Sequence, residues 1–156
     1  MEKSNLTRLA ASVLLLFGMT AAAHEGEEHQ HPTAHHGCLN AIVTCENGHG
    51  EVKIDGDTLN LWFVGGGTET MKAVRIPDAQ IVLSVTPDGE KKPSRTITLA
   101  AVPNELAEEK VGDCSHFVGK ADWLKEVKKF TATAEITFRG QRQPLRLEIP
   151  NGYDPD

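Results

Sequence analysis

The sequence predicts an all-β domain, an immunoglobulin-like antiparallel β-sandwich, on three observations. Polar and apolar residues alternate with a period of two over most of the chain after residue 50, as in half-buried strands. Clusters of glycine, proline and aspartate separate these runs at short, regular intervals. The runs together span about 100 residues, which is the size of such a sandwich. A small Greek-key barrel is the alternative arrangement of the same strands.

Seven or eight short strands are expected. A triple glycine at 65–67 ends the second of them, because glycine adopts the positive φ of tight reversals without steric cost. A Pro-Asp-Gly-Glu turn at 87–90 joins two of the runs into a hairpin. The expected strands are 51–54, 58–64, a short one at Val74 and Ile76, 80–86, 94–100, 115–118, 130–138 and 144–149.

Only residues 121–129 have helical spacing. Trp123, Leu124 and Val127 share one face there, which predicts one or two helical turns. Helix is otherwise expected to be scarce.

The first 23 residues have the three-part pattern of a secretory signal peptide. Lys3 and Arg8 supply a positive region, residues 9–19 are apolar, and small residues Ala21 and Ala23 precede the expected cleavage site. Export to the periplasm is therefore expected, with no transmembrane span left after cleavage. We expect four segments: the signal peptide (1–23), a flexible histidine-rich leader (24–44), the β-sandwich (45–150) and a C-terminal tail (151–156).

Charge and motifs exclude several functions. With 22 acidic and 16 basic side chains the net charge is −6, and no basic cluster occurs, so we expect no nucleic-acid partner. Aromatic residues make up only 5%, which leaves few platforms for stacking bases. The chain contains no G-x-S-x-G, H-E-x-x-H or phosphate-binding loop. We therefore expect a binding protein and not an enzyme.

The leader is rich in metal-binding side chains. Five of the seven histidines lie within residues 24–36, among three glutamates. Imidazole is a preferred ligand of divalent zinc, nickel, cobalt and copper, so the leader is expected to bind one of these metals, whose identity stays open. The alternative is a merely solvated or pH-sensing tail. The leader histidines are His24, His29, His31, His35 and His36.

Two further histidines lie near cysteines in the expected domain. Because export favours disulfides, a Cys45–Cys114 disulfide is the preferred interpretation, although pairings with Cys38 stay open. If the two loops meet in space, Cys45, Cys114, His49 and His116 would instead form a tetrahedral zinc site.

These features resemble a known group of proteins. The histidine-rich leader, His49-Gly50 with Gly48 before the first expected strand, and the Ser-x-Phe-x-Gly stretch at 115–119 are similar to small periplasmic β-sandwich proteins. Members of that group accompany bacterial heavy-metal efflux pumps or form the leading domain of their adaptor subunits, and the likeness spans residues 46–149. A second likeness is to copper-carrying immunoglobulin-like periplasmic proteins with an N-terminal histidine and Asp-x-His, although here His116 follows Asp113 one residue too far.

Both likenesses imply a metal-handling role without catalysis. We expect a periplasmic accessory protein that buffers divalent transition metal or delivers it to an efflux system. The alternative is an adaptor-like interaction domain of a membrane efflux complex with no metal role of its own.

Overall fold

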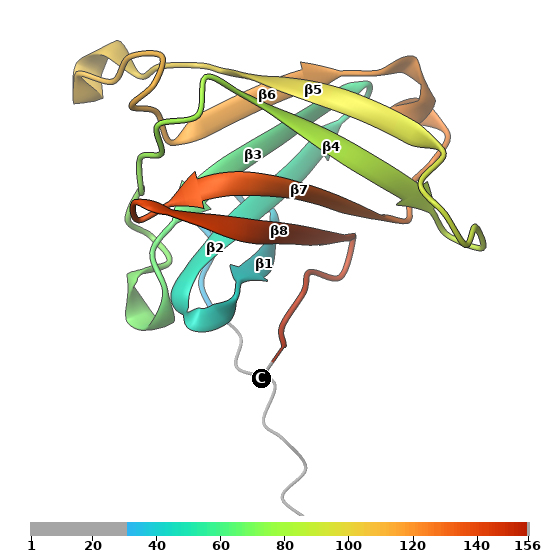
Figure 1. Cartoon of the computed structure of the whole chain (residues 1–156), viewed down its shortest axis with the longest axis horizontal. Coiled ribbons are helices and arrows are strands. Elements are labelled where there is room, and N and C mark those ends of the chain that lie inside the picture. The colour runs from blue at the N-terminus through green and yellow to red at the C-terminus, as the bar shows by residue number, and fades with distance from the viewer. Residues whose placement is uncertain (1–30, 156) are drawn as a thin grey trace, which may run out of the picture.

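The computed structural model describes residues 31–155, and this part of the chain is all-β (Figure 1). The predicted signal peptide lies outside the described residues, as do His24 and His29. The eight described strands are β1 (Cys38–Ile42), β2 (Thr44–Asp55), β3 (Thr58–Val64), β4 (Gln80–Pro87), β5 (Arg95–Ala101), β6 (His116–Lys120), β7 (Phe130–Phe138) and β8 (Gln141–Ile149).

All eight strands belong to one antiparallel sheet with the order β1-β2-β3-β6-β5-β4-β7-β8. The successive hairpins β4-β5-β6, with β3 returning beside β6, form a Greek-key arrangement. The outer strands β1 and β8 also meet, because the Glu148 backbone N–H donates to Asn40 Oδ1 at 2.6 Å. The all-β prediction is confirmed, but the sheet is continuous and nearly closed. It does not divide into the two sheets of the expected sandwich, and is nearer to the Greek-key alternative.

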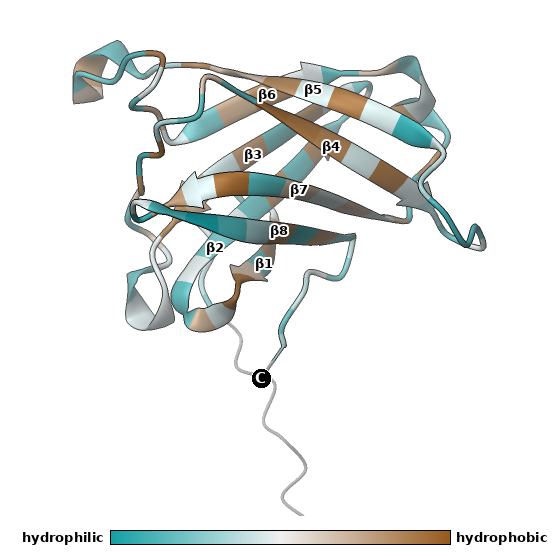
Figure 2. Ribbon diagram, in the orientation of Figure 1, coloured by the Kyte–Doolittle hydropathy of each residue, from teal (hydrophilic) through white to brown (hydrophobic). Residues whose placement is uncertain are grey.

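Alternation along the strands builds the core. Figure 2 shows apolar and polar positions alternating along β5, where Ile97 and Leu99 are buried. Three phenylalanines from different strands meet inside the sheet: the ring of Phe63 lies 5.7 Å from Phe117 and 6.1 Å from Phe138. Burying each such ring removes a large apolar area from water, the main favourable term in folding.

The domain begins earlier than the sequence indicates. Residues expected to end a flexible leader form β1, and β2 begins at Thr44 instead of residue 51. The reason is tertiary, because residues 44–50 contain two glycines and an asparagine and have little strand preference of their own. Thr44, His49 and Gly50 pair with β1, and His49 and Gly50 also pair with β3.

Two minor elements also differ from expectation. The helix predicted over 121–129 shortens to a single 3-10 turn, η3 (Asp122–Lys125), which buries Leu124. The short strand expected near Val74 and Ile76 contributes only isolated bridges, one of them from Ile76 to Cys114. The remaining 3-10 turns in the described part are η1 (Gly67–Glu69) and η2 (Glu105–Ala107). Among the described residues, no helix is long and apolar enough to cross a lipid bilayer.

Candidate metal centre

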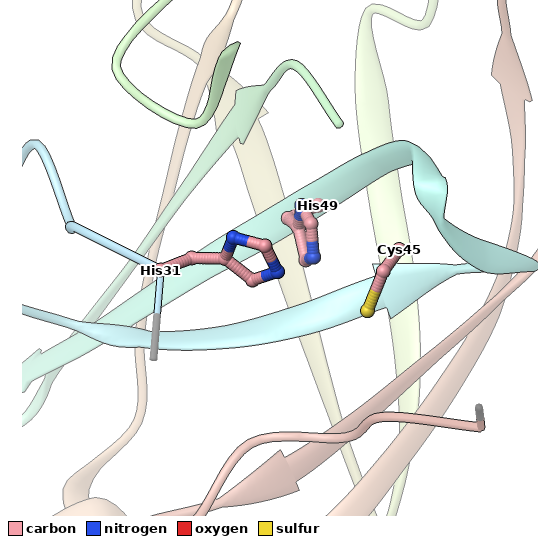
Figure 3. A group of neighbouring side chains, drawn as sticks. All are labelled: His31, Cys45 and His49. Carbon is pink, nitrogen blue, oxygen red and sulfur yellow. The ribbon is translucent and has the colours of Figure 1, made fainter. Parts of the chain in front are cut away.

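Three side chains that can bind a metal converge beside β2 (Figure 3). His31 comes from the segment before β1, whereas Cys45 and His49 belong to β2. The potential ligand atoms of these residues, hereafter the histidine–cysteine cluster, all lie within 4.8 Å of one another. His49 is buried, and His31 and Cys45 are half-buried. The cluster therefore joins two parts of the chain at a site that keeps access to solvent.

Two of the ligands come from the irregular first part of β2. The pairing of β1 with β2 shifts register there, because Ile42 pairs with Thr44 whereas Ala41 pairs with His49. Regular alternation of side chains does not hold across this shift, so the local course of the chain, and not the spacing of four residues, brings Cys45 and His49 together. Sequence analysis placed both residues in a loop before the first strand.

His49 is held in the form that binds metals. Its Nδ1 lies 3.2 Å from the carbonyl oxygen of Gly65, so Nδ1–H donates to that carbonyl and Nε2 keeps a lone pair for a metal. Burial lowers the pKa of His49, and the neighbouring His31 lowers it further, although the Gly65 contact acts in the opposite direction. A neutral imidazole at neutral pH is the ligating species.

His31 belongs to a segment that is anchored on the domain. Residues 31–37, hereafter the docked segment, lie against the fully buried Glu51 of β2. Its carboxylate accepts backbone N–H groups from Ala34 at 3.1 Å, His35 at 2.8 Å and Gly37 at 2.8 Å. These bonds position the end of the predicted leader, so part of that leader belongs to the folded domain.

A second contact fixes the docked segment nearer the cluster. The hydroxyl of Thr70 donates to the carbonyl oxygen of Pro32 at 2.8 Å. The imidazole of His31 then lies 5.4 Å from that of His49, with the rings tilted by 52°. His31 is therefore held within reach of a shared ion.

The donor set selects a class of metal. Two imidazoles and a thiolate suit zinc, cobalt, nickel and copper, whereas magnesium and calcium prefer oxygen ligands. Zinc–nitrogen and zinc–sulfur bonds of about 2.0 and 2.3 Å require ligand atoms roughly 3.5 Å apart. Small side-chain rotations would close the present spacing of at most 4.8 Å to that distance.

The other predicted ligands lie elsewhere. His35 and His116 both stack on Trp62, with ring centroids 4.1 and 4.6 Å from the indole and interplanar angles of 14° and 7°. Asn60 Oδ1 lies 3.1 Å from His116 Nε2. Together with Glu109 these three aromatic rings line a pocket of about 260 Å³.

His36 is exposed and takes part in neither group. The four ligands of the alternative zinc site, Cys45, His49, Cys114 and His116, do not come together, because Cys114 and His116 lie beside Glu109 and Trp62. Instead the structure joins one predicted leader histidine, His31, to the predicted pair Cys45 and His49.

The cysteines do not form the expected disulfide in the described part of the chain. Cys114 is buried, and two acceptors lie within reach of its single S–H, Glu109 Oε2 at 3.5 Å and the His116 carbonyl oxygen at 3.3 Å. The thiol of Cys45 instead donates to Asp154 Oδ1 at 3.2 Å. Cys38 is half-buried, and burial raises the pKa of its thiol.

Sequence reasoning missed two residues around the site. Glu51 appeared only as a polar position of an alternating strand, and no local signal marks it as buried. Asp154 lay in the predicted C-terminal tail, and its place beside Cys45 follows from the fold alone.

Fold and site together define a small all-β domain with a candidate centre for a transition metal. Comparisons with family models, curated proteins and solved structures find no match to the chain. The resemblance to efflux-associated proteins therefore stays a prediction from short motifs.

Proposed function

We propose that this chain is an exported accessory protein that binds a divalent transition metal and buffers it, or delivers it to an efflux system, in the periplasm. The observation that carries the proposal is the convergence of His31, Cys45 and His49. The signal-peptide pattern of residues 1–23 supports export, and the efflux association rests on the resemblance described above. Binding without catalysis is part of the same proposal.

The cluster is better suited to passing its metal ion to an acceptor than to storing the ion permanently. Two of its three ligands are half-buried, so an incoming acceptor can approach the ion without unfolding the domain. Additional histidines in the leader, among them His24 and His29, would raise the local concentration of metal near the cluster.

A second candidate function rests on a different observation. Four apolar side chains on the loops β3–β4 and β5–β6 are exposed, and Leu106 reaches 98% exposure. Exposed apolar groups of this kind mark protein contacts when they form a patch. Met71 and Val102 border the same pocket, and a contact surface there is what the adaptor-like interaction domain with no metal role of its own would use. The four residues are Met71, Val102, Leu106 and Val111.

Metal titration separates these functions. Zinc, nickel, cobalt and copper would each be titrated into the wild-type chain, a cluster variant with Cys45→Ser and His49→Gln, and a tail variant. The tail variant replaces His24, His29 and His36 by glutamine and leaves the cluster intact. We expect the cluster variant to lose the tightest site and the tail variant to keep it.

Two other results would redirect the proposal. Loss of binding in the tail variant alone would place the site in the leader. Absence of binding to all four metals would leave the adaptor-like domain as the better candidate.

A further inference from the structure

We propose that Asp154 completes the histidine–cysteine cluster as a fourth ligand, so that the site takes one zinc-like divalent ion in a tetrahedral shell of two nitrogens, one sulfur and one oxygen. This inference rests on the proposed metal-binding function and identifies the residue and metal class that the three-ligand cluster leaves open.

The distance between the Cys45 sulfur and the Asp154 carboxylate is close to the distance that such a shell requires. Asp154 Oδ1 lies 3.2 Å from Cys45 Sγ. With zinc–sulfur and zinc–oxygen bonds of about 2.3 and 2.1 Å at a tetrahedral angle, these atoms would be roughly 3.6 Å apart. This one distance therefore differs from the bound one by only a few tenths of an ångström. The Asp154 carboxylate lies outside the group of atoms within 4.8 Å of one another, so it has to turn toward the two imidazoles when the ion binds.

Asp154 is held at this place by the fold. The chain after β8 runs back along β1, where the Ala41 N–H donates to the Tyr153 carbonyl at 2.7 Å and the Tyr153 N–H donates to the Leu39 carbonyl at 3.2 Å. The guanidinium of Arg146 lies 5.0 Å from the centroid of the Tyr153 ring. Residues 152–155, hereafter the C-terminal strap, thus carry Asp154 to the site on backbone hydrogen bonds.

Charge favours a divalent ion in this set. Two neutral imidazoles, one thiolate and one carboxylate carry a total charge of −2, which a divalent ion neutralises. Binding breaks the S–H bond of Cys45 and forms a sulfur–metal bond, and the proton passes to the buffer without any change of oxidation state. Monovalent copper would leave a net negative charge and prefers soft ligands without a carboxylate.

The same ion would connect distant parts of the chain. His31 precedes β1, Cys45 and His49 lie in β2, and Asp154 follows β8. In Figure 1 the C-terminal trace leaves β8 and passes beside β1, where Tyr153 pairs with Asn40. A metal at this position would therefore fasten both ends of the domain onto β2.

Cobalt(II) is the probe that tests the coordination. In the full chain, tetrahedral cobalt with a thiolate gives intense visible d–d bands and a sulfur-to-cobalt charge-transfer band in the near ultraviolet. We expect Asp154→Asn to weaken cobalt binding by about 10-fold or more, since even outer-shell changes cost that much. Its d–d intensity should fall while the charge-transfer band remains.

Matched variants control the experiment. Asp88→Asn changes an exposed aspartate in the turn after β4 and should leave affinity and spectra as in the wild type. Cys45→Ser should abolish the charge-transfer band. The thermal midpoint of metal-free Asp154→Asn should match that of the wild type, which shows that the variant folds.

The outcomes distinguish this inference from the proposed function. Wild-type affinity and d–d intensity in Asp154→Asn would overturn Asp154 as a ligand and leave the three-residue site standing. A wild-type chain without cobalt bands, and without binding of zinc, would overturn both.

Discussion

At the scale of single residues, Glu51 anchors the segment that carries His31. It is fully buried, yet its carboxylate accepts three backbone N–H groups of the docked segment. Hydrogen bonds to a charged acceptor are stronger than neutral ones, and donors left without a partner in a buried place are costly. One side chain therefore positions the segment that carries His31.

Replacing Glu51 tests this role. Glu51→Ala removes the acceptor of three N–H groups and should lower the free energy of unfolding by about 3 kcal/mol or more. It should also weaken metal binding, because His31 loses its anchor. Urea unfolding and metal titration measure both effects, with Glu135→Gln at an exposed strand position as control. A loss no larger than in that control would contradict the anchoring role.

The buried histidines predict how stability depends on pH. Burial lowers the pKa of His116, and the nearby His35 lowers it further; burial lowers the pKa of His49 as well. The unfolded chain, whose histidines titrate near pH ~6.5, then binds more protons than the folded chain below that pH. The neutral forms of His49 and His116 therefore stabilise the folded chain above about pH 6.5. This stabilisation is lost as the pH falls from there through the lowered pKa values that the two histidines have in the folded chain.

We therefore expect the metal-free protein to lose stability between about pH 7 and pH 5, in the range where the unfolded histidines take up protons. Urea unfolding at several pH values measures this loss. His116→Gln should make the decline shallower, whereas the exposed His36→Gln should not. An equal slope in wild type and His116→Gln would exclude His116 as a cause.

At the scale of elements, the loop after β3 sets the position of β2. A Cβ added at Gly66 would collide with the backbone carbonyl of Glu46 and lie 2.6 Å from that of Cys45. The loop therefore packs directly against the backbone that carries the cluster's thiol. A glycine is needed there because of close approach and not because of its φ.

A pair of glycine variants separates an effect on the metal site from a general loss of stability. Gly66→Ala should weaken metal binding as well as stability, because relief of the clash moves Cys45. Gly119→Ala produces a comparable clash with β5, where a Cβ would lie 2.6 Å from the Thr98 carbonyl oxygen. It should lower stability but leave the metal affinity of the folded protein unchanged. Thermal unfolding with zinc titration below the midpoint measures both, and equal zinc affinity in the two variants would contradict this packing role.

At the scale of the whole molecule, metal should stabilise the domain. A ligand that binds only the folded state at 100 times its dissociation constant adds about 2.7 kcal/mol, which corresponds to roughly 10 °C for a domain of this size. Thermal unfolding with and without zinc measures the shift, and Cys45→Ser should remove most of it. An undiminished shift in that variant would place the stabilising ion elsewhere.

How much the sequence predicts differs between fold and site. Strands β3, β4, β5, β7 and β8 follow the expected alternation and turns closely. The sequence analysis also named all three residues of the cluster, but it placed His31 with the leader histidines and put Cys45 and His49 with Cys114 and His116. The structure groups these residues differently, since the sequence analysis assigned His31 to the leader and matched Cys45 with Cys114 on redox grounds instead of position.

What the sequence by itself determined is the all-β class, the turns and the supply of histidine and cysteine ligands, because alternation and turn chemistry act between near neighbours. What only the tertiary structure decided is the continuous sheet, the strand character of residues 44–50 and the meeting of His31, Cys45, His49 and Asp154. Those contacts join residues up to more than a hundred positions apart. They exist because β1 pairs with β2 and meets β8, and no local pattern encodes which strands become neighbours.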